Sequence, residues 1–175
     1  MPRLPYLDRA SLSPEIAELW DRRPLNLYRM IGHAKTAAPG FLALGRSLLT
    51  ESDLDPKLRE LVILRVGAIS KASYEIYQHR RVAQSVGLSE DEIGAALRER
   101  PDGCLTDLSR LVLRFTDAVV WEVKAPEPLY SAVAGHLTDR QMAELLLTIG
   151  FYMLVSRFLE NTEVEIETPA KKDKG

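Results

Sequence analysis

Three side chains, Glu60, Glu75 and His79, have the types and spacing that proton-transfer chemistry requires. Glu75 and His79 are one helical turn apart, so their side chains can meet on one helix face. In a helix that face is an apolar stripe, formed around His79 by Ala72, Ile76, Ala83 and Val86. A carboxyl and an imidazole that are sheltered from water can exchange a proton near neutral pH. The pattern therefore predicts a candidate acid–base site.

Glu60 lies on residues 58–69 (LRELVILRVGAI), a segment with almost no polar face. A buried carboxylate without a partner is costly there, and His79 is the obvious partner if residues 70–73 (SKAS) turn the chain into a helical hairpin. We therefore predict that Glu60 and His79 come within hydrogen-bonding distance. Arg65, on the same apolar segment, is expected to pair with a carboxylate in a structural role.

A purely structural role for these residues stays open at this stage. A glutamate in the first turn offsets the helix dipole, and Glu–His pairs four residues apart are common on protein surfaces. Tyrosines could line a pocket beside the pair, although tyrosines at the rim of a core give the same pattern. The predicted substrate-binding residues among them are Tyr28, Tyr74 and Tyr152, and Tyr77 is a further candidate for the pocket wall.

Helix start and stop signals recur along the chain, and no segment alternates as a strand would. Ser13–Pro14 and Asp55–Pro56 pair a capping residue with a first-turn proline. Ser89 with Glu92 and Thr138 with Gln141 form capping boxes, and Gly87 is a stop signal. The helices expected are 14–23, 26–35, 41–51, 56–69, 74–86, one after Ser89, 107–123 and 139–161, with 124–137 as a connection. We predict a single all-α domain at residues 1–165 and a polar tail at 166–175.

The composition indicates an ordinary globular protein of 175 residues with 46% hydrophobic and 27% charged residues. Because 23 basic residues face 25 acidic ones, there is no electrostatic case for binding nucleic acid or an anionic membrane. Apolar runs such as ELLLTIGFYMLVSRF look too short to span a bilayer, and residues 1–15 contain no apolar signal region. We expect a cytoplasmic protein.

Cys104 is the only cysteine, which excludes an intrachain disulfide and a zinc site built from cysteines. His33, His79 and His136 have none of the spacings of a metal site, and no flavin or pyridoxal phosphate signature is present. We therefore expect no metal and no cofactor, and a small-molecule substrate. Residues 58–69 and 142–159 are apolar on nearly all sides, which favours burial by partner subunits in a homo-oligomer.

The segment from Glu60 to His79 resembles the carboxymuconolactone decarboxylase and alkylhydroperoxidase D-like superfamily. The thiol peroxidases of that superfamily carry the motif E-x11-C-x2-C-x3-H, and its four positions hold Glu60, Ala72, Glu75 and His79 here. The flanking segments PLNLYRMIGHA, LRELVILRV, GLSEDEI and IGFYMLVSRFL resemble the longer, decarboxylase-like branch. The resemblance implies the helical bundle of alkylhydroperoxidase D, and homotrimers or homohexamers.

This sequence departs from the peroxidase motif at both thiol positions, where Ala72 and Glu75 replace the attacking and resolving cysteines. Glu60 and His79, the proton relay of the motif, remain, and Cys104 matches neither thiol position. Our leading hypothesis is a cofactor-independent acid–base enzyme, decarboxylase- or lyase-like, acting on a small carbonyl, lactone or carboxylic acid. The candidate catalytic residues are Glu60, Glu75 and His79. The alternatives are a non-catalytic oligomeric binding protein that keeps the pocket, and residual alkylhydroperoxidase-like activity.

Overall fold

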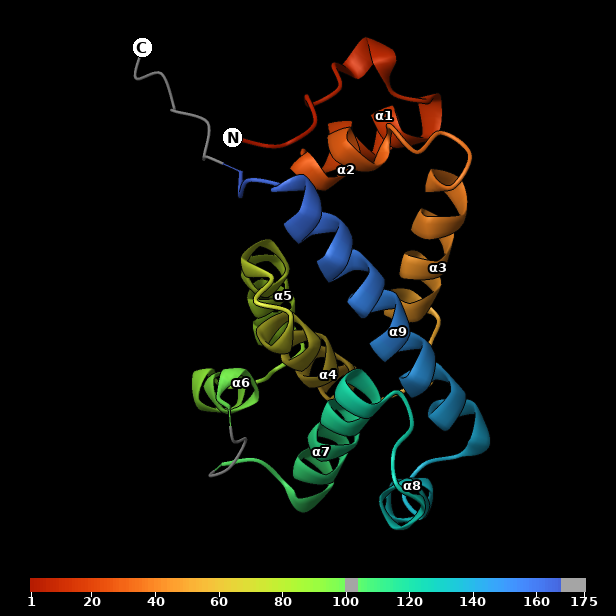
Figure 1. Ribbon diagram of the computed structural model, residues 1–175, viewed down its shortest axis with the longest axis vertical. Helices are drawn as coiled ribbons and strands as arrows, with labels where there is room; N and C mark the ends of the chain where they lie inside the picture. Colours follow the sequence, from red (N-terminus) through yellow and green to blue (C-terminus); the bar gives the residue numbers. More distant parts are fainter. Residues whose placement is uncertain (100–103, 168–175) are drawn as a thin grey trace.

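The computed structural model describes residues 1–99 and 104–167, and within these residues the fold is all-α, as predicted. A short 3-10 turn, Arg9–Ser11, precedes the helices (Figure 1). The helices are α1 (Pro14–Arg22), α2 (Asn26–Ile31), α3 (Ala38–Thr50), α4 (Pro56–Ile69), α5 (Ser73–Ser85), α6 (Glu90–Leu97), α7 (Asp107–Glu122), α8 (Glu127–Ala134) and α9 (Asp139–Thr162).

The predicted capping signals located the starts of four helices correctly, α1, α4, α6 and α9. Ser13 and Asp55 cap α1 and α4 through their side chains. Both predicted capping boxes form, at Ser89 with Glu92 and at Thr138 with Gln141. Gly87, at φ +88°, follows the end of α5, where only a residue tolerant of positive φ fits easily.

Three boundaries were predicted wrongly, and proline chemistry explains two of them. Residues 36–40 were expected to stop a helix, but α3 begins at Ala38 because Pro39 occupies its first turn, where a proline is tolerated. Residues 124–137 were expected to connect two helices, but they contain α8, which has Pro128 in its first turn. Helix α2 ends at Ile31, earlier than the predicted residue 35.

Helix α4 runs through the centre of the domain, with every residue from Leu58 to Gly67 buried. Helices α5, α6, α7 and α9 of the same chain pack around it (Figure 1). The domain itself therefore covers this apolar helix, and our inference that α4 needs partner subunits for its burial was wrong. On α9, by contrast, Leu147 and Leu154 remain 53% and 52% exposed.

The turn between α4 and α5 brings the candidate site together. The break falls where it was predicted, at Ser70–Ala72, with Lys71 in the left-handed region at φ +55°. Gly67 permits the close approach of the two helices, because a Cβ atom there would lie 3.1 Å from Ile76 Cγ1 and 3.6 Å from Glu75 Cγ. The hairpin thus aligns the first turns of α5 with the middle of α4.

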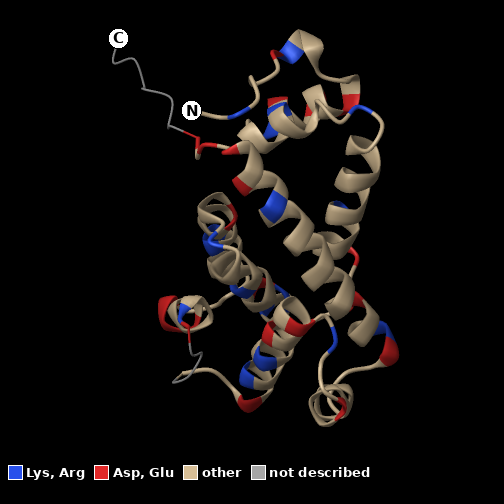
Figure 2. Ribbon diagram, in the orientation of Figure 1, with Lys and Arg blue, Asp and Glu red and all other residues tan. Residues whose placement is uncertain are grey.

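Helix α9 crosses the domain diagonally and packs against α4 along the core (Figure 1). Its 24 residues include a window of mean hydropathy 1.5. By length and composition alone this helix is apolar enough to span a membrane, contrary to our expectation from the sequence. Half of that window is buried inside the domain. No charged residue interrupts α9 between Glu144 and Arg157 (Figure 2).

The two ends of the described chain lie near each other, and Arg3 donates a hydrogen bond to Glu163 (Figure 1). The polar tail was expected to begin at residue 166, yet Glu167 is half-buried and accepts hydrogen bonds from Tyr74, Gln78 and the backbone N–H of Asn26. Residues 168–175 of the predicted tail lie outside the described residues.

Candidate functional site

Glu60 and His79 meet across the α4–α5 hairpin, which confirms the predicted contact. Glu60 Oε2 lies 2.7 Å from His79 Nδ1, and both side chains are buried. An ionised carboxylate can only accept, so Nδ1 carries the proton of this hydrogen bond. The bond therefore fixes both the ring orientation and the atom that faces away from Glu60, which is Nε2.

Glu75 occupies the other edge of the same imidazole. Its Oε1 lies 3.2 Å from His79 Nε2, one helical turn away, and only 3% of the residue is exposed. Because Nε2 can accept from a protonated carboxyl or donate to an ionised one, a single proton can sit on either side of this contact. Glu75 and His79 therefore form a unit able to take up and return a proton.

Arg59 completes the group and was missed in the sequence. It is buried beside Glu60 on α4, and its Nε donates to Glu60 Oε1 over 3.1 Å. Glu60 is thus held by a guanidinium on one oxygen and by the imidazole on the other. The sequence did contain a signal for Arg59, because this residue directly precedes Glu60 on an apolar segment, where a second buried charge also requires a partner.

The electrostatics of the group favour proton exchange near neutral pH. Burial raises the pKa of Glu75 to about 7; the charge of His79 opposes this rise, and Glu60 adds to it. Burial lowers the pKa of His79, but the hydrogen bond that His79 donates to Glu60 and the charges of Glu75 and Glu60 outweigh it, so that the pKa is raised overall. Because the charge on each group shifts the pKa of the other, the two groups titrate as a coupled pair.

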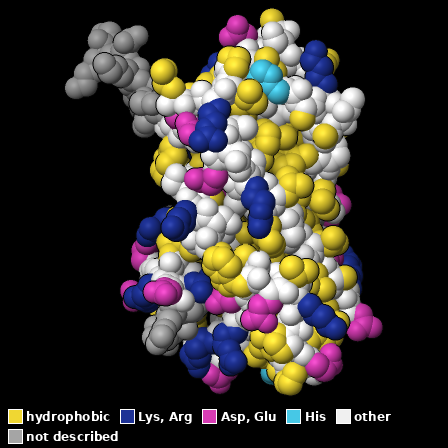
Figure 3. All heavy atoms as spheres, in the orientation of Figure 1, with side chains coloured by type: hydrophobic (Ala, Val, Ile, Leu, Met, Phe, Trp, Pro, Cys, Tyr) yellow, Lys and Arg dark blue, Asp and Glu magenta, His cyan; other side chains and the backbone are white. Residues whose placement is uncertain are grey.

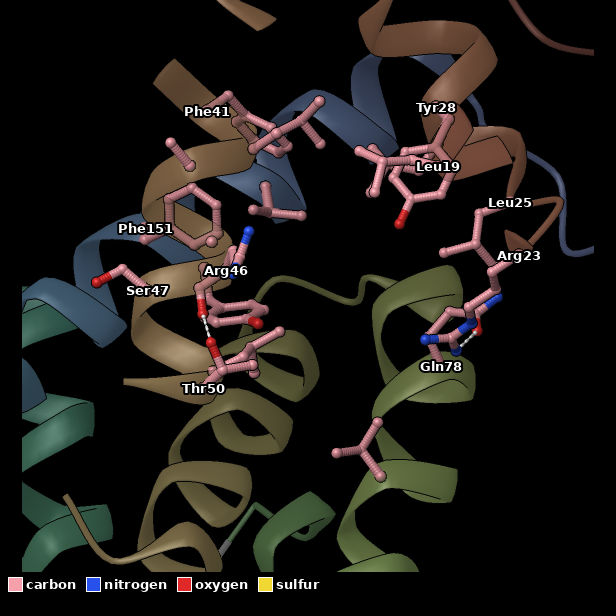
Figure 4. A pocket seen from close by; sticks show the side chains of 18 of the residues that line it. Leu19, Arg23, Leu25, Tyr28, Phe41, Arg46, Ser47, Thr50, Gln78 and Phe151 are labelled. Carbon is pink, nitrogen blue, oxygen red and sulfur yellow. Dashed lines mark hydrogen bonds between the residues drawn. The ribbon is translucent and has the colours of Figure 1, made fainter. Parts of the chain in front are cut away.

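Glu75 and His79 open into a pocket of about 900 Å³. Helices α1, α3, α5 and α9, with α2 and the loop before it, form its walls (Figure 4). Its apolar surface comes from Leu19, Leu25, Leu27, Tyr28, Phe41, Leu42, Leu49, Tyr74, Val82, Phe151, Tyr152 and Val155. Glu60 is not part of the lining and lies behind the imidazole.

All three predicted substrate-binding tyrosines, Tyr28, Tyr74 and Tyr152, line this pocket. The ring of Tyr152 stands edge-on to His79 with 5.0 Å between ring centroids. Burial raises the pKa of each of the three phenols, so that they stay neutral at physiological pH. Tyr77 is not part of the lining and is 39% exposed.

Arg23, Gln78 and Glu167 form a polar chain at the edge of the pocket that sequence reasoning did not find. Arg23 donates to Gln78 Oε1 over 2.9 Å (Figure 4), and Gln78 Nε2 donates to Glu167 over 2.7 Å. Glu167 also accepts from the Tyr74 hydroxyl over 2.5 Å. These contacts join residues far apart in the sequence, and no local pattern indicates them.

The remaining titratable candidates lie elsewhere. Arg65 forms an ion pair with Asp117 on α7 and donates to backbone carbonyls at the end of α6, as its predicted structural role requires. His33 and His136 are exposed and do not line the pocket. Cys104 is exposed and likewise lies outside the lining.

Residues 36–118, which include Glu60, Glu75 and His79, match the model of the carboxymuconolactone decarboxylase family. An uncharacterized peroxidase-related protein from Ralstonia eutropha JMP134, described as an alkylhydroperoxidase AhpD core, has the same fold with a TM-score of 0.84. Its identity is 17%, over 95% of this chain and 92% of that chain. The family match over residues 36–118 and the shared fold support the resemblance of this chain to the carboxymuconolactone decarboxylase and alkylhydroperoxidase D-like superfamily.

Other solved proteins with this fold have different descriptions. An uncharacterized peroxidase-related protein from Silicibacter sp. TM1040 has a TM-score of 0.79 at 17% identity, covering 95% of this chain and 94% of that chain. The debrominase Bmp8, solved as a cysteine-to-alanine variant in complex with 2,3,4-tribromopyrrole, has a TM-score of 0.78 at 15% identity, covering 96% and 95%. No curated protein matches the sequence. Identities this low establish the shared fold, and the function has to be argued from the site.

This chain carries a carboxyl at the second thiol position of the peroxidase motif. Glu75 lines the pocket there, whereas Ala72, at the first thiol position, is fully buried and outside the lining. Arg23, Tyr28, Tyr152 and Glu167 lie outside the matched residues 36–118. The matched region therefore carries the acid–base group, and segments beyond it supply much of the pocket wall.

Proposed function

We propose that the protein is a cofactor-independent acid–base enzyme, decarboxylase- or lyase-like, that acts on a small carbonyl compound, lactone or carboxylic acid. The observation that carries the proposal is the contact between Glu75 Oε1 and His79 Nε2 at the wall of the pocket. A buried carboxyl whose pKa is about 7 can be both acid and base at physiological pH.

In this mechanism the pair moves one proton at the reacting carbon. The ionised form of the pair removes a proton from a carbon next to a carbonyl, and the electrons of the C–H bond pass into the carbonyl as an enolate. In a decarboxylation the C–C bond to the carboxylate breaks instead, carbon dioxide leaves, and the protonated pair donates to the carbon. The carbonyl group of the substrate accepts the electrons in both cases.

Glu60 has a positioning role in this proposal, because it lies behind the imidazole. Its hydrogen bond directs Nε2 toward Glu75, and its charge stabilises the imidazolium that forms when the pair is protonated. Arg59 in turn holds the Glu60 carboxylate in place. General acid–base catalysis contributes about 10²- to 10⁴-fold, so the pocket must supply further rate enhancement by orienting the substrate.

Two observations support acid–base chemistry over a thiol peroxidase. The only cysteine of the chain, Cys104, is exposed and outside the pocket, whereas a peroxidase needs a thiolate as its nucleophile. The two thiol positions of the peroxidase motif hold Ala72 and Glu75 in this chain, so a carboxyl stands where the second thiol would be.

The test is proton exchange and carbon dioxide release from a panel of 3-oxo acids, 2-oxo acids and unsaturated lactones, followed by NMR in D2O. His79→Ala should lower the rate about 100-fold or more. Arg81→Ala, on the exposed face of α5, is the matched control and should retain full activity. Ligand binding without exchange or carbon dioxide release across the panel would favour the non-catalytic binding protein. Thiol-dependent consumption of peroxide would favour the peroxidase.

A further inference from the structure

The pocket contains three guanidinium groups, and two of them have carboxylate partners. Arg22 pairs with Glu18, and Arg46 lies 3.9 Å from Glu51. Among the residues that the structure describes, Arg23 has no carboxylate within ion-pairing distance. Its only side-chain hydrogen bond there is the one to Gln78, which leaves most of its five N–H donors available.

Gln78 holds the guanidinium of Arg23 at the wall of the pocket. The Gln78 amide cannot easily turn away, because its Nε2 donates to Glu167 while its Oε1 accepts from Arg23. Glu167 is occupied by Tyr74, Gln78 and the Asn26 N–H, so it fixes the amide without forming an ion pair with Arg23. Figure 4 shows Arg23 and Gln78 together on one wall, with Arg46 on α3 across the pocket.

Arg23 lines the same pocket as the acid–base pair. Gln78 directly precedes His79 on α5, and the charge of Arg23 acts on His79, Tyr28 and Tyr74, all of which line the pocket. The lining also contains aromatic and aliphatic side chains, with Phe41 and Phe151 5.0 Å apart between ring centroids. Its other polar groups include Ser47, Thr50 and the carboxylates Glu15, Glu18 and Glu51. A ligand that suits this pocket has an anionic end for Arg23 and a compact apolar body.

We infer that Arg23 is the anchor for a substrate carboxylate, and that the substrate class is a monoanionic acid whose carboxylate is joined by a short linker to an aromatic ring. This inference rests on the proposed function in taking the pocket as the substrate site. A guanidinium binds a carboxylate through two parallel hydrogen bonds, which fixes orientation as well as position. The carbon chain of the acid then lies along the wall toward Glu75 and His79.

The experiment compares the binding of two probes of the same shape, phenylacetate and phenylacetamide, by isothermal titration calorimetry and by NMR. The wild-type protein should bind the anion about tenfold more tightly than the neutral amide. Arg23→Gln should abolish this preference, whereas Arg23→Lys should keep part of it because the charge remains. Arg46→Gln removes the same charge from the opposite wall and should keep the preference.

Equal binding of the two probes would overturn the inference, and so would binding of neither at millimolar concentration. A preference that survives Arg23→Gln, or that is lost in Arg46→Gln, would overturn it as well. The binding measurement involves no turnover, so it separates this inference from the proposed chemistry. Phenylacetate that binds through Arg23 with no proton exchange on any substrate would refute the acid–base enzyme and leave the anchor standing. Proton exchange that depends on His79 but not on Arg23 would refute the anchor and leave the acid–base enzyme standing.

Discussion

Glu60 and Glu75 bind opposite edges of one imidazole, and only Glu75 lines the pocket. Glu60 Oε2 is 2.7 Å from His79 Nδ1, whereas Glu75 Oε1 is 3.2 Å from His79 Nε2. The two carboxyls therefore have different tasks despite their shared partner. Glu60 is paired with Arg59 and fixes the ring, and Glu75 is placed where a substrate can reach it.

The first prediction concerns the coupling of Glu75 and His79. Glu75→Gln keeps the shape of the side chain but removes its charge, and that charge raises the pKa of His79. The apparent pKa of His79 should therefore be lower in the variant, measured by NMR titration of the imidazole carbons. Glu160→Gln, on the exposed side of α9, is the control and should leave the titration of His79 unchanged. A His79 titration that is identical in Glu75→Gln would show that the two side chains do not interact.

The second prediction is the pH dependence of stability. The pKa of Glu75 is raised from 4.5 to about 7 in the folded protein, so folding favours its protonated form. The resulting contribution to the free energy of unfolding is about 3 kcal/mol. It is fully present below pH 4.5 and is lost as the pH rises through about 7. The raised pKa of His79 acts in the same direction, since its protonated form is also favoured by folding.

The measurement for this second prediction is urea denaturation of the wild type and Glu75→Gln at several pH values. The free energy of unfolding of the wild type, relative to the variant, should fall between about pH 4.5 and pH 7.5. A difference that stays constant over this range would mean that Glu75 titrates normally in the folded protein.

Much of this arrangement could be predicted from the sequence, because it depends on local patterns. Capping residues located the starts of α1, α4, α6 and α9, and the break at residues 70–73 implied the hairpin that joins Glu60 to His79. The contacts of Arg23 and Glu167 could not be predicted, since they depend on how distant segments pack around α5. The burial of α4 was misjudged for the same reason: periodicity shows that a helix is buried but not which chain covers it.

The third prediction tests the buried charges behind the imidazole. Glu60→Ala leaves Arg59 and the imidazole without their carboxylate in the core, and should lower the free energy of unfolding by about 3–5 kcal/mol. Arg59→Ala combined with Glu60→Ala should cost less than the sum of the two single changes, because the pair is in contact. Denaturation curves of the three variants form the double-mutant cycle, and strict additivity would show that the ion pair contributes nothing.

The fourth prediction separates the chemistry of this chain from a thiol mechanism. Cys104→Ala should leave activity unchanged, because the side chain is exposed and lies outside the pocket. His79→Ala should remove activity while the circular dichroism spectrum stays that of a helical protein. If Cys104→Ala were the inactivating change instead, the proposed acid–base site would be the wrong one.

The last prediction concerns assembly, for which we propose a homotrimer or homohexamer formed through the outer face of α9. Leu147 and Leu154, two turns apart, are 53% and 52% exposed, and Leu44 on the neighbouring α3 is 40% exposed. Hydrophobic side chains gather along this part of the surface (Figure 3), and contiguous apolar patches of this kind commonly mark interfaces.

Leu147→Glu combined with Leu154→Glu should therefore yield monomers in light scattering, because carboxylates cannot be buried unpaired in an interface. Trp121→Glu, which replaces a 69% exposed side chain on α7, is the control and should keep the assembly. A wild-type protein that is monomeric at micromolar concentration would contradict the proposal.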